Sequence, residues 1–168
     1  MSAILSSSSA VVRSGASLDV VETIIEANEW PFDRSYDELI VSVSGSWCDY
    51  HLCFSEAADM GALHVSCAPD LRVPQERYGD LYVLIGRMNE RLLFGHFELA
   101  ADEGVPLYRV AQILPDGSGR ACQVAERLIE AALTESERFY PAVQLVLWAG
   151  HTPDEALNAV LMEPVGHC

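Results

Sequence analysis

The stretch ALHVSCAPDLRVPQERYGDLYVLIGRMNERLLFGHFEL, residues 62–99, decides the fold of this chain. Residues 62–68 are apolar and partly β-branched, and Pro69 ends them, which predicts a strand. Pro74 suits the first position of a helix, where a missing backbone N–H costs nothing. Residues 94–99 predict a second strand. Between Pro74 and that strand, apolar residues recur at three- and four-residue steps, a pattern typical of one buried helical face: Tyr78, Leu81, Tyr82, Ile85, Met88 and Leu92.

The outer side of this predicted helix carries charged residues, and Gly79, Val83 and Gly86 lie among them. Small residues let another backbone approach closely. A glycine inside a helix costs about 1 kcal/mol relative to alanine, so two of them suggest a purpose in packing. We therefore take Gly79, Val83 and Gly86 as a candidate interface with a second copy of the protein. The alternative is that the glycines only seat the helix on its own sheet.

The residues before this unit predict one helix and a hairpin. Residues 1–16 are rich in serine and lack periodicity, so we expect a flexible tail. A first helix begins at Ser17 or Asp19, with Asp19 and Glu22 as a capping box. Strands follow over 38–43 and 47–54, and the second alternates between polar odd positions and apolar even ones. That alternation indicates one buried face and one wet face.

The residues after the unit predict one more strand and two helices. The strand covers 107–114, and a long helix begins at Ser118. Pro141 must kink or split this helix, because proline removes a helical hydrogen bond. Thr152 and Glu155 form a capping box that opens a last short helix.

The order of elements is therefore α-β-β-β-α-β-β-α-α. Connections of hairpin length make the sheet largely antiparallel, with about five strands and helices packed on it, so the fold class is α+β. We expect a single domain over residues 17–164 behind the tail.

Composition narrows the classes of function. The chain has 25 acidic residues against 10 basic ones, all arginine, and its net charge is −15. The absence of lysine excludes Schiff-base chemistry on a lysine. The negative charge opposes binding to nucleic acid. No apolar run approaches the length of a membrane span. Five cysteines without the spacing of a disulfide framework favour the cytoplasm.

The candidate chemical sites are all weak in the sequence. His51, His64 and His96 fall on neighbouring strands and could together hold zinc, but no local ligand spacing supports this. Histidines that hydrogen-bond to neighbours on the sheet are the favoured interpretation. Cys53 lies two residues from His51 on the same face, without an oxyanion hole or an orienting group for a nucleophile. We predict no catalytic residue, metal or cofactor.

Two sets of charged residues and two cysteines have structural interpretations as well. Asp70 and Arg72 are expected to form an ion pair that orders the connection before the central helix. The acidic residues Glu98, Asp102 and Glu103 could act as paired acids, although a hydrophilic turn is the commoner explanation. Cys67 and Cys122 are expected to be buried structural thiols.

Four phrases resemble the bacterial YbjN-type domain family over residues 18–162. They are LHVSCAPDLRVP (63–74), NERLLFGHFEL (89–99), PLYRVAQIL (106–114) and ERFYPAVQLVLWAG (137–150). The family is described as regulators of sensory transduction. The resemblance implies a fold similar to that of type III secretion chaperones, an α+β sandwich that pairs into dimers and binds other polypeptides. It implies no catalytic residues.

We therefore expect a non-enzymatic cytoplasmic regulator or chaperone-like protein that forms a homodimer and binds an unknown protein partner. A small enzyme or metal-dependent protein using the face of His51, His64 and His96 is one alternative. A domain that senses a small molecule is another, and a closed apolar cavity would favour it.

Overall fold

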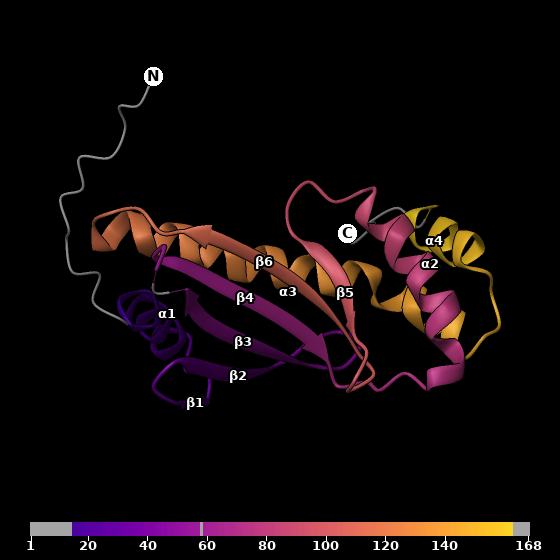
Figure 1. Cartoon of the computed structure of the whole chain (residues 1–168), viewed down its shortest axis with the longest axis horizontal. Helices are drawn as coiled ribbons and strands as arrows, with labels where there is room; N and C mark the ends of the chain where they lie inside the picture. The colour runs from indigo at the N-terminus through magenta and orange to yellow at the C-terminus, as the bar shows by residue number, and fades with distance from the viewer. Residues whose placement is uncertain (1–14, 58, 163–168) are drawn as a thin grey trace, which may run out of the picture.

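A six-stranded antiparallel sheet forms the centre of the protein. The computed structural model describes residues 15–57 and 59–162, and its strands lie in the order β1-β2-β3-β4-β6-β5 (Figure 1). Every pair of neighbours is antiparallel. The expected α+β class is confirmed. The strands are β1 (Phe32–Arg34), β2 (Glu38–Ser44), β3 (Asp49–Ala57), β4 (Ala62–Pro69), β5 (His96–Ala100) and β6 (Val105–Ile113).

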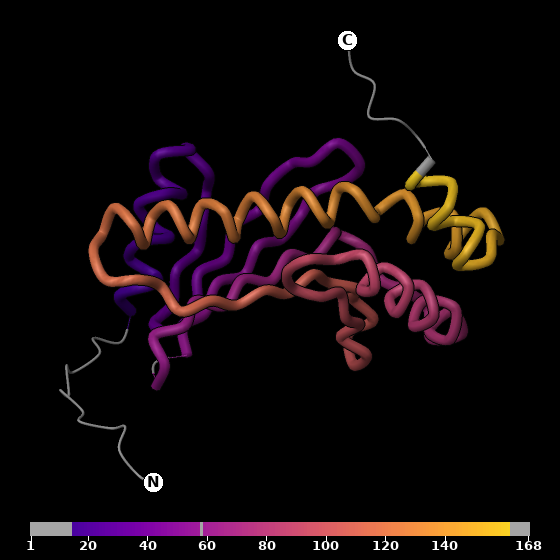
Figure 2. The backbone as a smooth tube through the Cα atoms, turned by 90° about the horizontal axis from the view of Figure 1, so that it is seen from above, coloured from indigo at the N-terminus to yellow at the C-terminus, as the bar shows by residue number. Residues whose placement is uncertain are grey.

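Helices cover one face of the sheet and one of its ends. The long helix α3 runs along the sheet from end to end, and α1 packs beside it over β2, β3 and β4 (Figures 1 and 2). Helices α2 and α4 pack against each other at the opposite end from α1. The helices are α1 (Ala16–Ala27), α2 (Tyr78–Asn89), α3 (Ser118–Leu147) and α4 (Pro153–Met162), with a short 3-10 turn η1 (Gln75–Arg77) before α2. Among the described residues, no helix combines the length and the apolar character that a bilayer span requires.

The core lies between the sheet and helices α1 and α3. The predicted alternation in β3 is confirmed, because Tyr50, Leu52 and Phe54 are buried while His51 is exposed. Aromatic rings tie the far strands to α3. The ring of Phe97 lies 5.6 Å from that of Phe139 and 5.3 Å from that of Tyr108, both in edge-on geometry. Edge-on pairs of this kind add about 0.5–1.5 kcal/mol to the burial of the rings themselves.

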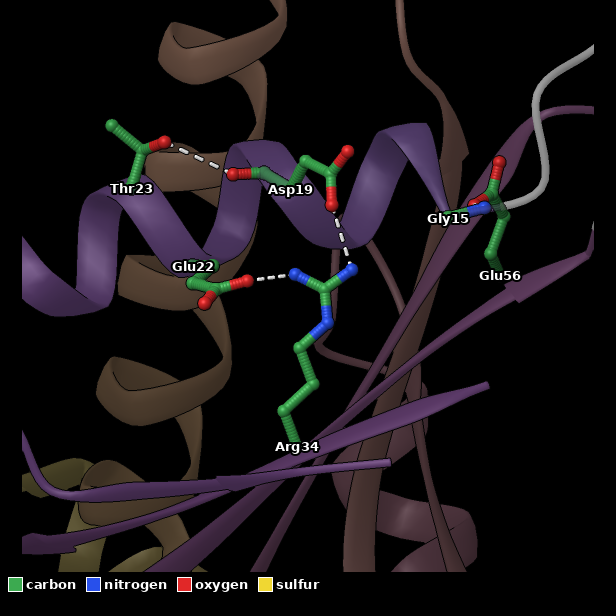
Figure 3. A network of polar contacts seen from close by, with 6 residues as sticks. All are labelled: Gly15, Asp19, Glu22, Thr23, Arg34 and Glu56. Carbon is green, nitrogen blue, oxygen red and sulfur yellow. Dashed lines mark hydrogen bonds and ion pairs between the residues drawn. The ribbon is translucent and has the colours of Figure 1, made fainter. Parts of the chain in front are cut away.

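The start of α1 differs from the expected capping box. The helix begins at Ala16, after Gly15, whose φ is 96° and whose N–H donates to Glu56 Oε2 at 2.7 Å. Asp19 and Glu22 instead bind the guanidinium of Arg34, Asp19 at 2.7 Å (Figure 3). Arg34 lies on β1, the sixth strand that the sequence did not predict, and it fastens this edge strand to α1. Most of the expected tail lies outside the described residues.

Two further expectations about helices have clear outcomes. The capping box of α4 is confirmed, since the Glu155 N–H donates to Thr152 Oγ1 at 3.3 Å and Glu155 Oε2 accepts from the Thr152 N–H at 2.9 Å. Of the two expectations for Pro141, the split is wrong, because α3 continues from Ser118 to Leu147, while the kink stays a prediction. Tyr140, Ala142 and Val143, on either side of this proline, are buried. Their packing offsets the hydrogen bond that the proline removes.

The buried side of α2 is rotated slightly from the expected one. Leu81, Ile85 and Met88 are buried as predicted, but Leu84 is buried as well and Tyr82 is 51% exposed. The helix packs against α3 and α4 in addition to β5. Neighbours on several sides, rather than one sheet face, therefore decide which residues are covered.

Candidate functional site

The face of the sheet opposite α1 and α3 is not covered by any described element. We call it the open face. Its side chains alternate with those of the core along each strand, and they are at least partly exposed apart from Ala62 at the start of β4. They include Ile40, Ser42, His51, Cys53, His64, Ser66, His96, Glu98, Arg109 and Ala111. The open face is therefore the largest surface on which the sheet can present side chains to a ligand.

The three candidate histidines share the open face but do not converge. His96 is opposite Arg109, and Arg109 is opposite Ser66 of β4, so His96 lies two strands away from β4. Strands are about 4.8 Å apart, which puts about 10 Å between the strands of His64 and His96. His51 lies on β3 opposite Ala68, four positions along β4 from His64. The described residues contain no group of three potential metal ligands. The composite zinc site is therefore not assembled in this structure.

The environment of Cys53 opposes a role as nucleophile. Its thiol donates to Glu38 Oε1 at 2.7 Å, while His51 Nδ1 contacts Ser42 Oγ at 3.0 Å instead of the thiol. Burial, followed by the hydrogen bond to Glu38, raises the pKa of Cys53 to about 12. The thiol therefore stays protonated at neutral pH, and the attacking thiolate does not form.

The other two cysteines considered in the sequence differ from each other. Cys67 is fully buried in the core, as predicted, and burial raises the pKa of its thiol to about 12. Cys122 is only half-buried, so the expectation that it is a core thiol is wrong. Its position on the first turns of α3 leaves one side of the residue open to solvent.

The acidic residues do not form a pair for acid–base chemistry. Glu98 binds two partners on the open face, Arg109 Nη2 at 2.9 Å and His96 Nε2 at 3.3 Å. Asp102 and Glu103 are exposed in the turn between β5 and β6, as a hydrophilic turn predicts. Glu98 therefore serves to anchor side chains on the open face.

The expected ion pair between Asp70 and Arg72 is absent from the described residues. Main-chain hydrogen bonds order this connection instead. The N–H of Asp70 donates to the carbonyl of Asp49 at 2.9 Å, and the N–H of Val73 donates to the carbonyl of Gly104 at 2.8 Å. Both side chains are exposed.

The candidate interface on α2 is open to solvent. A Cβ atom built on Gly79 or Gly86 would meet no atom within 4 Å, and Val83 is 53% exposed. The glycines therefore do not seat α2 on its own sheet, which removes that alternative. Contact with a second copy stays a prediction.

The structure has a groove beside β6 that the sequence did not predict. It has a volume of about 920 Å³ and lies between the last residues of β6, the segment before β5 and the side of α3. It exists because β5 pairs only with residues 105–109 of β6 and leaves residues 110–113 without a strand on that side. The sequence predicts both strands but not how far each extends, so the difference in length could not be used.

Comparisons with known proteins give a family and a similar solved structure. The YbjN family model, described as "Putative bacterial sensory transduction regulator", matches residues 17–145. The crystal structure of YbjN from E. coli, described as "a putative transcription regulator", is 12% identical. The alignment covers 71% of this chain and 90% of that one, with a TM-score of 0.46. No curated protein matches the sequence.

Proposed function

This chain belongs to the YbjN family, and from that premise we propose that it is a cytoplasmic regulator that acts by binding another protein. The family's description as regulators of sensory transduction supports a regulatory role. The observation that carries the proposal is the open face. It presents an apolar side chain, Ile40, beside polar and charged ones such as His51 and Arg109, all reachable by a partner. A mixed surface of this kind suits a regulated protein–protein contact.

Catalysis is the weaker alternative for the same surface. The thiol of Cys53 is held in its protonated form, and Glu98 is occupied by Arg109 and His96. The three histidines point from different strands and positions. A binding role uses these residues as they stand, whereas a catalytic role would require them to be rearranged.

We propose in addition that the protein is a homodimer, paired through the side of α2 that carries Gly79, Val83 and Gly86. Neither glycine has a left-handed backbone, and neither is crowded by a neighbour. Nothing described in the chain therefore requires glycine at these positions, although each costs about 0.5–1 kcal/mol in a helix. The close approach of another backbone supplies a reason.

The binding role is tested by affinity capture with matched variants. The tagged protein is purified from its own cells beside Ile40→Glu, on the open face, and Tyr36→Glu, in the turn between β1 and β2. Both residues are exposed, Ile40 by 41% and Tyr36 by 84%, so both variants should fold, which circular dichroism checks. We expect a protein in stoichiometric amounts with the wild type and with Tyr36→Glu, and its loss with Ile40→Glu. Capture of no protein, or equal capture by the two variants, would contradict the proposal.

A further inference from the structure

Within the described part of the chain, no strand pairs with the outer edge of β6 over its last four residues. Pairing with β5 runs from Val105 to Arg109, while pairing with β4 continues to Ile113. Residues 110–113 therefore have a neighbouring strand on one side only (Figure 1). Their outward backbone groups are available to another strand.

The segment before β5 is fixed in a position that keeps this edge open. Gly95 has a φ of 65°, and a side chain there would collide with the Tyr108 hydroxyl and the backbone of Arg109. The Tyr108 hydroxyl also donates to the carbonyl of Phe94 at 2.7 Å. The chain therefore turns away at Gly95 instead of continuing β5 alongside residues 110–113. The space left beside β6 is the groove of about 920 Å³.

The lining of the groove differs in charge from the rest of the protein. Its ionisable residues are Arg109, Arg127, His64 and His96. Glu98 already binds two of them, Arg109 Nη2 at 2.9 Å and His96 Nε2 at 3.3 Å. Among the described residues, Arg127 forms no ion pair. In a chain with a net charge of −15, this unpaired arginine favours an acidic side chain on a partner.

The two sides of the β6 edge carry different side chains, and this difference predicts the order of side chains along a bound partner strand. Arg109 and His96 lie on the open face. On the opposite side, α3 contributes Val124 and Leu128 to the groove. Side chains of an added strand would alternate between these two sides. Acidic residues would then face Arg127, which α3 also contributes to the groove, and apolar ones would lie beside Ala111 and Ile113 on the open face.

We propose that residues 110–113 of β6 and the adjoining groove bind an extended segment of a partner protein, which adds to the sheet as a strand. The segment alternates acidic and apolar side chains. Addition of a strand to a free sheet edge is a recurrent mode of peptide recognition, in which main-chain hydrogen bonds give affinity and alternate side chains give specificity. This inference rests on the proposed function, since it names the site and the kind of segment by which a partner is held.

The test is a titration of the full-length protein with fluorescein-labelled peptides, followed by anisotropy. The probe is the amidated peptide EVEVEVE. One control replaces its central valine with proline, which removes a main-chain donor, and another replaces every glutamate with lysine. We expect binding of the probe, a loss of at least about tenfold in affinity for the proline peptide, and no binding of the lysine peptide. Amide hydrogen exchange at residues 110–113 should slow when the probe is bound.

A matched pair of protein variants locates the site. Arg127→Glu reverses a charge in the groove, whereas Arg120→Glu makes the same change on α3 outside it. We expect Arg127→Glu to weaken binding of the probe by at least about tenfold and Arg120→Glu to leave it nearly unchanged.

Three outcomes would overturn the inference. They are absence of binding by the probe, equal affinity for the probe and the proline peptide, and full displacement of the probe by millimolar citrate, which would indicate an anion site without strand addition. The proposed function has a separate readout. A partner captured by the wild type and lost with Ile40→Glu would support it even if the probe peptide did not bind.

Discussion

Replacement of Gly79 and Gly86 by alanine should strengthen helix α2 and weaken the proposed dimer at the same time. Both residues have ordinary helical backbones, and an added Cβ would meet no atom within 4 Å. Glycine costs about 0.5–1 kcal/mol relative to alanine in a helix. The two sites are seven residues, roughly 10 Å, apart, so their effects should add. The double variant should therefore gain about 1–2 kcal/mol in the free energy of unfolding of the monomer.

The effect on association has the opposite sign. If the backbones of two copies approach at Gly79 and Gly86, each new methyl group enters space that the partner occupies. Overpacking of a close contact costs about 1–3 kcal/mol. The dissociation constant of the dimer should then rise by at least about tenfold. Opposite signs from a single pair of substitutions separate a role in the interface from a general effect on folding.

Two measurements test this. Urea unfolding followed by circular dichroism, at protein concentrations below the dissociation constant, gives the stability of the monomer. Sedimentation velocity over a range of concentrations gives the dimer. Gly119→Ala is the control, because Gly119 lies on α3 and is equally uncrowded. It should leave association unchanged. A double variant as dimeric as the wild type would refute the interface, and a monomeric wild type at cellular concentration would refute the dimer.

Three further predictions follow from single sites. Ile85→Ala should lower the free energy of unfolding by about 2–5 kcal/mol, because Ile85 is buried. Arg87→Ala should cost less than about 1 kcal/mol, because its ion pairs with Glu90 and Asp154 are exposed; similar losses in urea unfolding would contradict the orientation of α2. Hydrogen bonds from Thr152 hold the pKa of the Glu155 carboxyl below its ordinary value. The capping box should therefore stabilise the protein above that ordinary pKa and lose its effect as the pH falls through the lowered one. Glu155→Gln should flatten the acid side of a plot of melting temperature against pH, and parallel plots would argue against this. Glu38→Ala should speed maleimide labelling of Cys53 at pH 8, because it removes an acceptor that raises the pKa of the thiol. Peptide mapping by mass spectrometry, with buried Cys67 as internal control, would show no acceleration if burial alone protects Cys53.

Features that depend on nearby residues could be predicted from the sequence. The alternation along β3 gives the correct buried face because side chains on a strand repeat every two residues. The capping box of Thr152 and Glu155 forms because its partners are three residues apart. The strand, helix and strand predicted within residues 62–99 are also present, because their patterns likewise depend on residues close in the sequence.

Features that depend on distant residues could not be predicted. Asp19 and Glu22 have the spacing of a capping box, yet Arg34 binds both. That competition appears only when β1 joins the sheet. The buried face of α2 is set partly by α4, which lies more than sixty residues later in the chain.

The candidate site shows the same division. The sequence correctly places His51 and Cys53 on one face of one strand, because residues two apart on a strand always share a face. Whether three histidines converge depends on the register between strands, and pairing places His96 opposite Arg109 instead of near His64. The groove depends on where β5 begins, which the packing of Gly95 against Tyr108 determines.

The acidity of the chain and the cationic groove have complementary roles at the free edge. An unpaired strand edge invites pairing with any extended chain, including a second copy of the same protein. Two copies that each carry a charge of −15 repel one another. That repulsion is screened beyond about 8 Å at physiological salt, so it acts only when the two surfaces are already close. Within the groove, Arg127 favours an acidic side chain. Net charge thus opposes indiscriminate pairing between copies. The local charge of the groove favours an acidic segment, and a short segment adds little repulsion from the rest of the protein.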